Sequence, residues 1–139
     1  MKKFMLMFFI GYLLLLSSVA FAGDKAFSFN LENTGTQFIT YTGDYNTKSY
    51  STHPAAVKLT YNNAQGGGYY IHLSYKNIFG AFFPATENKW FSGVVQQKLG
   101  YLSGQNIVNR NYYISARIDN DYPGPYAVTG LFNSDDSIG

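Results

Sequence analysis

The sequence predicts an all-β protein, an antiparallel β-sandwich or jelly roll of about seven short strands, with a small closed β-barrel as the alternative. Apolar and polar residues alternate with a period of two in several segments, and turn-forming residues separate these segments. No stretch after residue 22 has helical periodicity. Aromatic residues make up 19% of the chain and cysteine is absent, so packing rather than disulfide bonds must stabilise the fold.

The first 22 residues have the three parts of a secretory signal peptide. A basic region, Lys2-Lys3, is followed by an apolar run over residues 4–16 and then by small residues at Ala20 and Ala22. The alternative, a transmembrane anchor, needs roughly 20 apolar residues, and this run is shorter. We therefore expect cleavage after Ala22 and a secreted or extracytoplasmic product.

Residues 23–139 are then expected to form a single all-β domain without a membrane span. At its start, Phe27, Phe29 and Leu31 alternate with polar residues and predict a strand, which a turn at 33–35 follows. Residues 38–42 predict a second short strand. The polar residues 43–54 predict a surface loop.

The middle of the chain predicts a β-hairpin. Apolar residues alternate with polar ones over 57–61 and again over 69–75. The connecting residues 62–68 end in three glycines, which supply the positive φ angles that hairpin loops need. The two strands are therefore expected to pair with each other.

The segment after this hairpin is expected to be irregular over 76–88, with Phe79, Phe82 and Phe83 folded back onto the core. Residues 90–99 predict a further strand that bends at Gly93. Residues 112–118 and 126–132 alternate once more and predict a final hairpin across a tight turn at 120–125.

Charge and motifs exclude several classes of function. Loss of Lys2 and Lys3 leaves eight basic and eight acidic residues, and the basic ones do not cluster, so nucleic-acid binding is not expected. No Gly-x-Ser-x-Gly motif, paired carboxylates or phosphate-binding loop occurs, so no enzyme activity and no cofactor are predicted. A metal site is not predicted either, because His53 and His72 lack neighbouring ligands. Four acids, at 119, 121, 135 and 136, offer oxygen ligands of the kind that Ca²⁺ binds, but they lack the ordered spacing of a calcium loop and are expected to be solvated.

The surplus of aromatic residues gives the candidate binding residues. If Tyr69 and Tyr112 face inward, then Tyr70 and Tyr113 face outward. His72 and Arg117 are expected on that outer side, together with Lys58 and Ser115. The four candidates are Tyr70, His72, Tyr113 and Arg117. Such a surface stacks against sugar rings or holds a protein partner; alternatively, the outward tyrosines only stabilise cross-strand pairs.

The end of the chain resembles a family of small exported bacterial proteins known as domain of unknown function 2712. The resemblance lies in Tyr126-x-Val128-x-Gly130 followed by Phe132 and then by acids. A second stretch, 52–61, is similar to the Pro-aromatic-x-Val-x-Leu strand of that family, with an alanine where the family often has tryptophan. The resemblance implies an exported β-sandwich. It implies no activity and no site residues.

Together these features predict an exported, non-enzymatic β-sandwich that binds carbohydrate or protein at a cell surface. The alternative is a bacteriocin-like secreted antagonist that acts on neighbouring cells. Small size, export, the lack of cysteine and aromatic β-strands are compatible with both.

Overall fold

A computed structural model describes residues 23–64, 67–119, 121, 124–136 and 138. The expected leader, with Ala20 and Ala22, lies outside these residues, as do parts of the predicted turns at 62–68 and 120–125. The predicted fold class is confirmed, because the described residues form two antiparallel sheets and no helix. They contain ten strands rather than about seven, since Asn46–Thr47 and Phe82–Pro84 also pair and the predicted strand at 90–99 is replaced by two strands.

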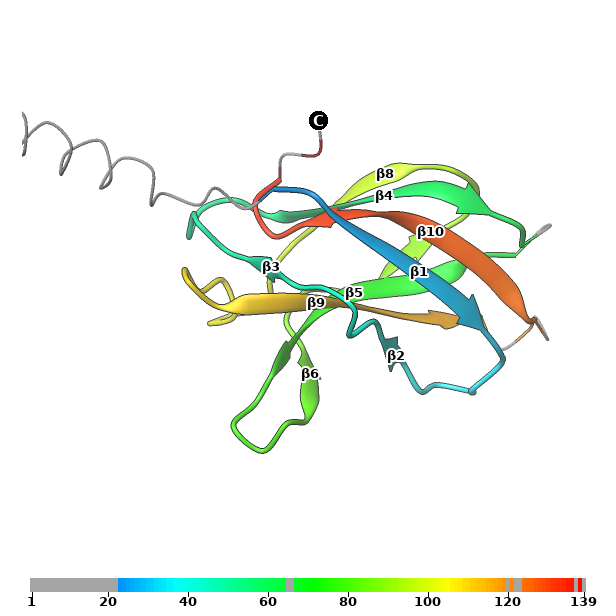
Figure 1. Cartoon of the computed structure of the whole chain (residues 1–139), viewed down its shortest axis with the longest axis horizontal. Helices are drawn as coiled ribbons and strands as arrows, with labels where there is room; N and C mark the ends of the chain where they lie inside the picture. Colours follow the sequence, from blue (N-terminus) through cyan, green and yellow to red (C-terminus); the bar gives the residue numbers. More distant parts are fainter. Residues whose placement is uncertain (1–22, 65–66, 120, 122–123, 137, 139) are drawn as a thin grey trace, which may run out of the picture.

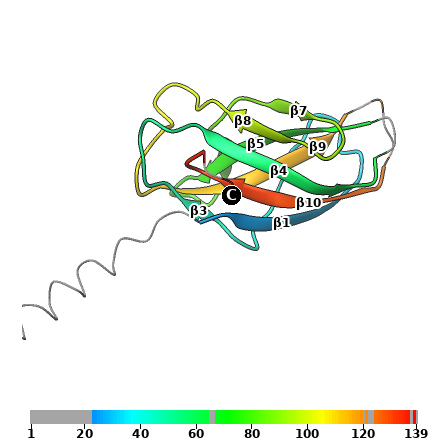
Figure 2. The ribbon, with the colours of Figure 1, turned by 90° about the horizontal axis from the view of Figure 1, so that it is seen from above.

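The two sheets pack face to face (Figure 1). Figure 2 looks onto the first sheet, in which the strands follow the order β1-β10-β4-β8. In the second sheet the order is β2-β9-β5-β6, β3 also pairs with β9, and β7 also pairs with β5. The first sheet comprises β1 (Lys25–Leu31), β10 (Tyr126–Asn133), β4 (Ala55–Asn62) and β8 (Gln96–Leu99). The second comprises β2 (Ile39–Thr40), β3 (Asn46–Thr47), β5 (Tyr69–Lys76), β6 (Phe82–Pro84), β7 (Lys89–Phe91) and β9 (Asn111–Ile118).

The core lies between the sheets and follows the period-two pattern of the sequence. In β1, every second residue from Phe27 to Leu31 is buried and the residues between them are exposed. Alternation of this kind places one face of each strand in the core. The inward residues include Phe27, Phe29, Leu31, Val57, Leu59, Val128 and Phe132 from the first sheet, and Tyr69, Ile71, Leu73, Phe91, Tyr112, Ile114 and Ile118 from the second.

Both predicted hairpins are wrong. The strands β4 and β5 lie in different sheets, and so do β9 and β10. The chain instead crosses from one sheet to the other, and the first strand, β1, pairs with the last, β10. Alternation reports only that one strand face is buried, so it is the same for two strands that pair and for two strands that face each other across the core.

The predicted strand at 90–99 is also divided between the sheets. Its first residues, up to Phe91, belong to β7, which pairs with β5. The residues from Gln96 onward form β8, which pairs with β4. Gly93, where a bend was predicted, has a φ of +75° and lies in the connection between them. Its left-handed conformation, which glycine adopts without steric cost, redirects the chain into the other sheet.

Candidate functional site

The four predicted binding residues share the outer face of the second sheet. Tyr70 is opposite Arg117 in the pairing of β5 with β9, His72 is opposite Ser115, and Ser74 is opposite Tyr113. Their neighbours Tyr69 and Tyr112 are fully buried in the core, as predicted. Since side chains alternate between faces, the residues on this ladder project away from the core.

Lys58, expected on the same face, is on β4 of the first sheet. That expectation depended on the incorrect pairing of β4 with β5. The shared face is therefore formed by β5 and β9 with the short strands on either side of them.

An open groove of about 550 Å³ lies on this outer face. We call it the outer groove. Strands β5 and β9 form its floor, and the segments around β2, β6 and the start of β7 form its sides. Its lining residues are Phe38, Ile39, Thr40, His72, Ser74, Phe82, Pro84, Asn88 and Ser115.

Three hydroxyl groups form a chain across the floor of the groove. Ser115 Oγ lies 2.7 Å from Thr40 Oγ1 and 2.7 Å from Ser74 Oγ. The two hydrogen bonds use two of the three hydroxyl protons, so one proton and several lone pairs remain for a ligand. Ser115 and Ser74 are buried, so the positions of these groups are fixed by the sheet.

His72 adds an acceptor beside the hydroxyl chain. Its Nδ1 lies 2.8 Å from Asn88 Oδ1, and because an amide oxygen only accepts, Nδ1 carries the proton. Burial lowers the pKa of His72 from its ordinary value of 6.5, and the hydrogen bond with Asn88 opposes this shift. The imidazole is therefore neutral at pH 7, with Nε2 as an acceptor.

Aromatic rings flank the polar floor. The ring centre of Phe38 lies 4.2 Å from that of His72, and Phe82 packs edge-on against Tyr113 at 5.1 Å. The guanidinium of Arg117 lies 5.4 Å from the centre of the Phe38 ring. At 4.4 Å, Arg117 also stacks on Tyr70, which contacts Trp90 in turn.

Of the four predicted residues, only His72 lines the groove directly. Arg117 and Tyr113 each support a lining ring, and Tyr70 holds Arg117. Sequence reasoning placed Ser115 on this face but named none of the other eight lining residues as a binding candidate. Ser74 and Ser115 were recognisable as outward positions of alternating strands, whereas Thr40 and Asn88 come from distant segments and carry no local signal.

A second polar cluster lies in the segment predicted to be a surface loop. Lys48 is fully buried, and its Nζ donates to the carbonyl oxygens of His53 (2.8 Å) and Ser134 (2.6 Å) and to Asp135 Oδ1 (3.1 Å). Asp135 also accepts from the backbone N–H groups of Ser49 (2.7 Å) and Tyr50 (3.0 Å). Burial lowers the pKa of Lys48, and the hydrogen bond and charge of Asp135 oppose that shift.

The expectation of a solvated acidic end is thus wrong for Asp135, which is 4% exposed and ties the 43–54 segment to the end of β10. Sequence reasoning missed this pair because its members are 87 residues apart. Within the described residues, no three His, Cys, Asp or Glu side chains gather closely enough to hold a metal ion.

Comparison of the chain with family models, with curated proteins and with solved structures finds no match. The resemblance to domain of unknown function 2712 therefore stays a prediction. In the described part of the chain, no helix has the length and apolar character needed to cross a membrane.

Proposed function

We propose that this protein is an exported, non-enzymatic surface module that binds carbohydrate in the outer groove. The observation that carries the proposal is the combination of a hydroxyl chain on the groove floor with aromatic rings on its sides. A sugar ring presents apolar C–H faces and hydroxyl groups that both donate and accept. The groove offers a partner for each kind of group.

The polar part of the groove suits neutral hydroxyls. The chain of Thr40, Ser115 and Ser74 both donates and accepts, and Nε2 of the neutral His72 accepts. No carboxylate or ammonium group is among the lining residues, so a ligand displaces no strongly hydrated charge on entering. The guanidinium of Arg117, which is not a lining residue, lies 5.4 Å from the centre of the Phe38 ring.

The same geometry supports a binding role over a catalytic one. Glycoside hydrolysis uses a pair of carboxyl groups, and the lining residues include none. A serine nucleophile needs a base within hydrogen-bond reach, whereas the described hydrogen bonds of Ser115 Oγ go to Thr40 and Ser74 rather than to His72.

The test is a screen of residues 23–139 against a glycan array and cell-wall polysaccharides, followed by titration calorimetry with any ligand found. Thr40→Val removes one hydroxyl of the chain with little change of shape, and Phe38→Ala removes a side ring. Each should weaken binding about tenfold or more, which corresponds to the loss of one good polar or ring contact. Tyr61→Ala is the control, because Tyr61 is exposed on β4 of the other sheet.

Joint replacement of Tyr70 and Tyr113 by Ala should also weaken binding, through loss of support for Arg117 and Phe82. A screen in which no glycan binds would overturn the proposal. So would a glycan whose affinity is unchanged in Thr40→Val and Phe38→Ala.

A further inference from the structure

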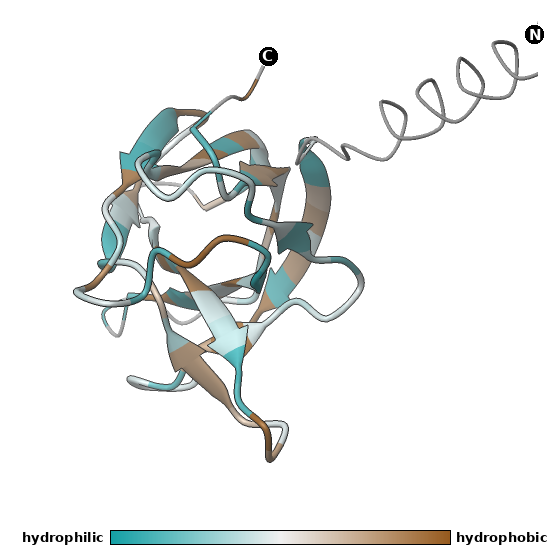
Figure 3. Cartoon of the chain, turned by 90° about the vertical axis from the view of Figure 1, so that its left-hand side faces the viewer, coloured by the Kyte–Doolittle hydropathy of each residue, from teal (hydrophilic) through white to brown (hydrophobic). Residues whose placement is uncertain are grey.

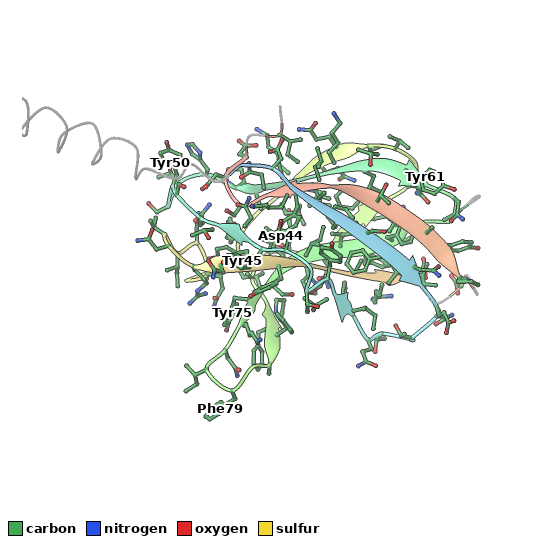
Figure 4. All side chains as sticks on the ribbon, viewed as in Figure 1. Asp44, Tyr45, Tyr50, Tyr61, Tyr75 and Phe79 are labelled. Atoms are coloured by element: carbon green, nitrogen blue, oxygen red, sulfur yellow. The ribbon has the colours of Figure 1, made fainter. Side chains whose placement is uncertain are left out.

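The hairpin of β5 and β6 projects from the body of the molecule (Figure 1), and the turn at its far end contains hydrophobic residues (Figure 3). Ile78 is 93% exposed and Phe79 is 88% exposed, more than any other large apolar residue described. We call these two residues the apolar tip. Figure 4 places Phe79 at the far end of the hairpin and Tyr75 near its base. The expectation that Phe79 folds back onto the core is therefore wrong.

The turn that carries the apolar tip is closed by hydrogen bonds. Asn77 N donates to Ala81 O at 2.8 Å, and Gly80 N donates to Asn77 O at 3.1 Å. The side-chain oxygen of Asn77 accepts from the backbone N–H groups of Phe79 (3.0 Å) and Ala81 (2.9 Å). Gly80 has a φ of +82°, which completes the tight turn. Because these hydrogen bonds fix the conformation of the turn, the two side chains are held outward.

Two adjacent large apolar side chains that the turn holds in water form a candidate contact site for an apolar partner. Its shape is convex, so it enters a partner rather than receives one. The lipid–water boundary accepts such a protrusion without a complementary pocket, and the hydrogen bonds of the turn reduce the number of backbone N–H groups that insertion must desolvate.

Charge around the hairpin favours an anionic lipid surface. Residues 75–86 contain one lysine and no Asp or Glu. Lys76 pairs with Phe82 where the strands meet the turn, with Nζ 5.7 Å from the centre of the Phe82 ring, and Arg110 stacks on Tyr75 at 4.4 Å. With the tip in the acyl boundary, these cations lie at the level of the headgroup phosphates, where each attracts anionic lipid.

We propose that the apolar tip inserts Ile78 and Phe79 into the surface of an anionic phospholipid bilayer and anchors the protein there reversibly. The proposal does not depend on glycan binding. It places the outer groove, to which Phe82 and Pro84 of the same hairpin contribute, close to the membrane surface.

The test uses residues 23–139, which carry all ten described strands, and vesicles of phosphatidylcholine with about 30% phosphatidylglycerol. Phe79→Trp should show a blue-shifted emission on adding vesicles and quenching by lipids brominated in the acyl chain. The unaltered chain, whose single tryptophan is Trp90, supplies the background. Joint replacement of Ile78 and Phe79 by Ser should weaken co-sedimentation with vesicles about tenfold or more, from the lost burial of two large side chains.

The matched control replaces Ile107 and Val108 by Ser, because these apolar neighbours are 38% and 39% exposed on another loop. This variant should bind vesicles like the unaltered chain, and Lys76→Gln should weaken binding only to the anionic vesicles. Circular dichroism verifies that each variant is folded. The proposal is overturned if the Phe79→Trp emission is unchanged by vesicles, or if the Ser pair at the tip leaves binding intact. It is also overturned if that pair instead converts a dimer into a monomer, because the tip then binds a second copy.

Discussion

Replacing Lys48 by Met should destabilise the fold by about 3–5 kcal/mol, because it removes one member of a fully buried ion pair. The Lys48 ammonium donates three hydrogen bonds, to two carbonyl oxygens and to Asp135. Methionine has a similar length, so the change leaves little cavity. The cost comes from the acceptors that lose their donor, at roughly 1–3 kcal/mol for each buried group left unsatisfied.

Two backbone N–H groups still hold the Asp135 carboxylate in the variant, at 2.7 and 3.0 Å, which keeps the expected loss below the sum of three separate penalties. A loss of about 4 kcal/mol is a large share of the roughly 5–15 kcal/mol of a typical domain. For a domain of this size it lowers the melting temperature by about 10–20 °C.

The assay is equilibrium unfolding in urea, followed by circular dichroism, on residues 23–139. Lys98→Met is the matched control, because Lys98 pairs with the adjacent acid, Asp136, at 3.0 Å but is 67% exposed. An exposed ion pair contributes about 0–1 kcal/mol, so this variant should unfold close to the unaltered chain. The reasoning is refuted if Lys48→Met loses less than about 1 kcal/mol, or if the two variants lose equal amounts.

Three further changes test other parts of the structure. Burial lowers the pKa of His72 in the folded protein below its ordinary value of 6.5. As the pH falls below about 6.5, His72 therefore takes up a proton in the unfolded chain before it does so in the folded chain. The stabilisation of the fold by the neutral His72 is complete above that pH and decreases on acidification. The His72→Gln variant should lack this part of the pH dependence of the urea unfolding midpoint. Gly130→Ala should lower the free energy of unfolding by about 1–3 kcal/mol or more, because a Cβ there would lie 2.3 Å from a backbone oxygen. Gly100→Ala is the control, because a Cβ there would have no contact under 3.7 Å, and it should change the urea midpoint little. Tyr112→Phe should cost about 1–2 kcal/mol in the same measurement, since its hydroxyl accepts from one backbone N–H of the 101–110 loop at 3.0 Å and donates to a carbonyl there.

The outer groove and the apolar tip share one hairpin, because β6 lines the groove and the turn between β5 and β6 carries the tip. A protein anchored by Ile78 and Phe79 would present its groove to ligands near the membrane surface. The two proposals make separate predictions, because Phe38→Ala affects only glycan binding and the Ser pair at the tip affects only vesicle binding.

The sequence by itself determined the fold class and the orientation of each long strand. Alternation reports which face of a strand is buried, so it placed Phe27 and Tyr69 in the core and Tyr70 and His72 outside it. It also placed Ser74 and Ser115 on the outward side, where they contribute to the groove floor.

Only the tertiary structure decided which strands pair and which distant groups meet. Alternation is identical for neighbours in one sheet and for strands in facing sheets, so both predicted hairpins were wrong. Lys48 and Asp135 lie in polar segments that indicate solvent exposure, and they are buried because each neutralises the other across 87 residues of chain. Phe79 is a residue type that is common in protein cores, and it is exposed because hydrogen bonds to Asn77 fix the turn that holds its side chain outward. Such outcomes depend on long-range contacts, which a local pattern of residues does not encode.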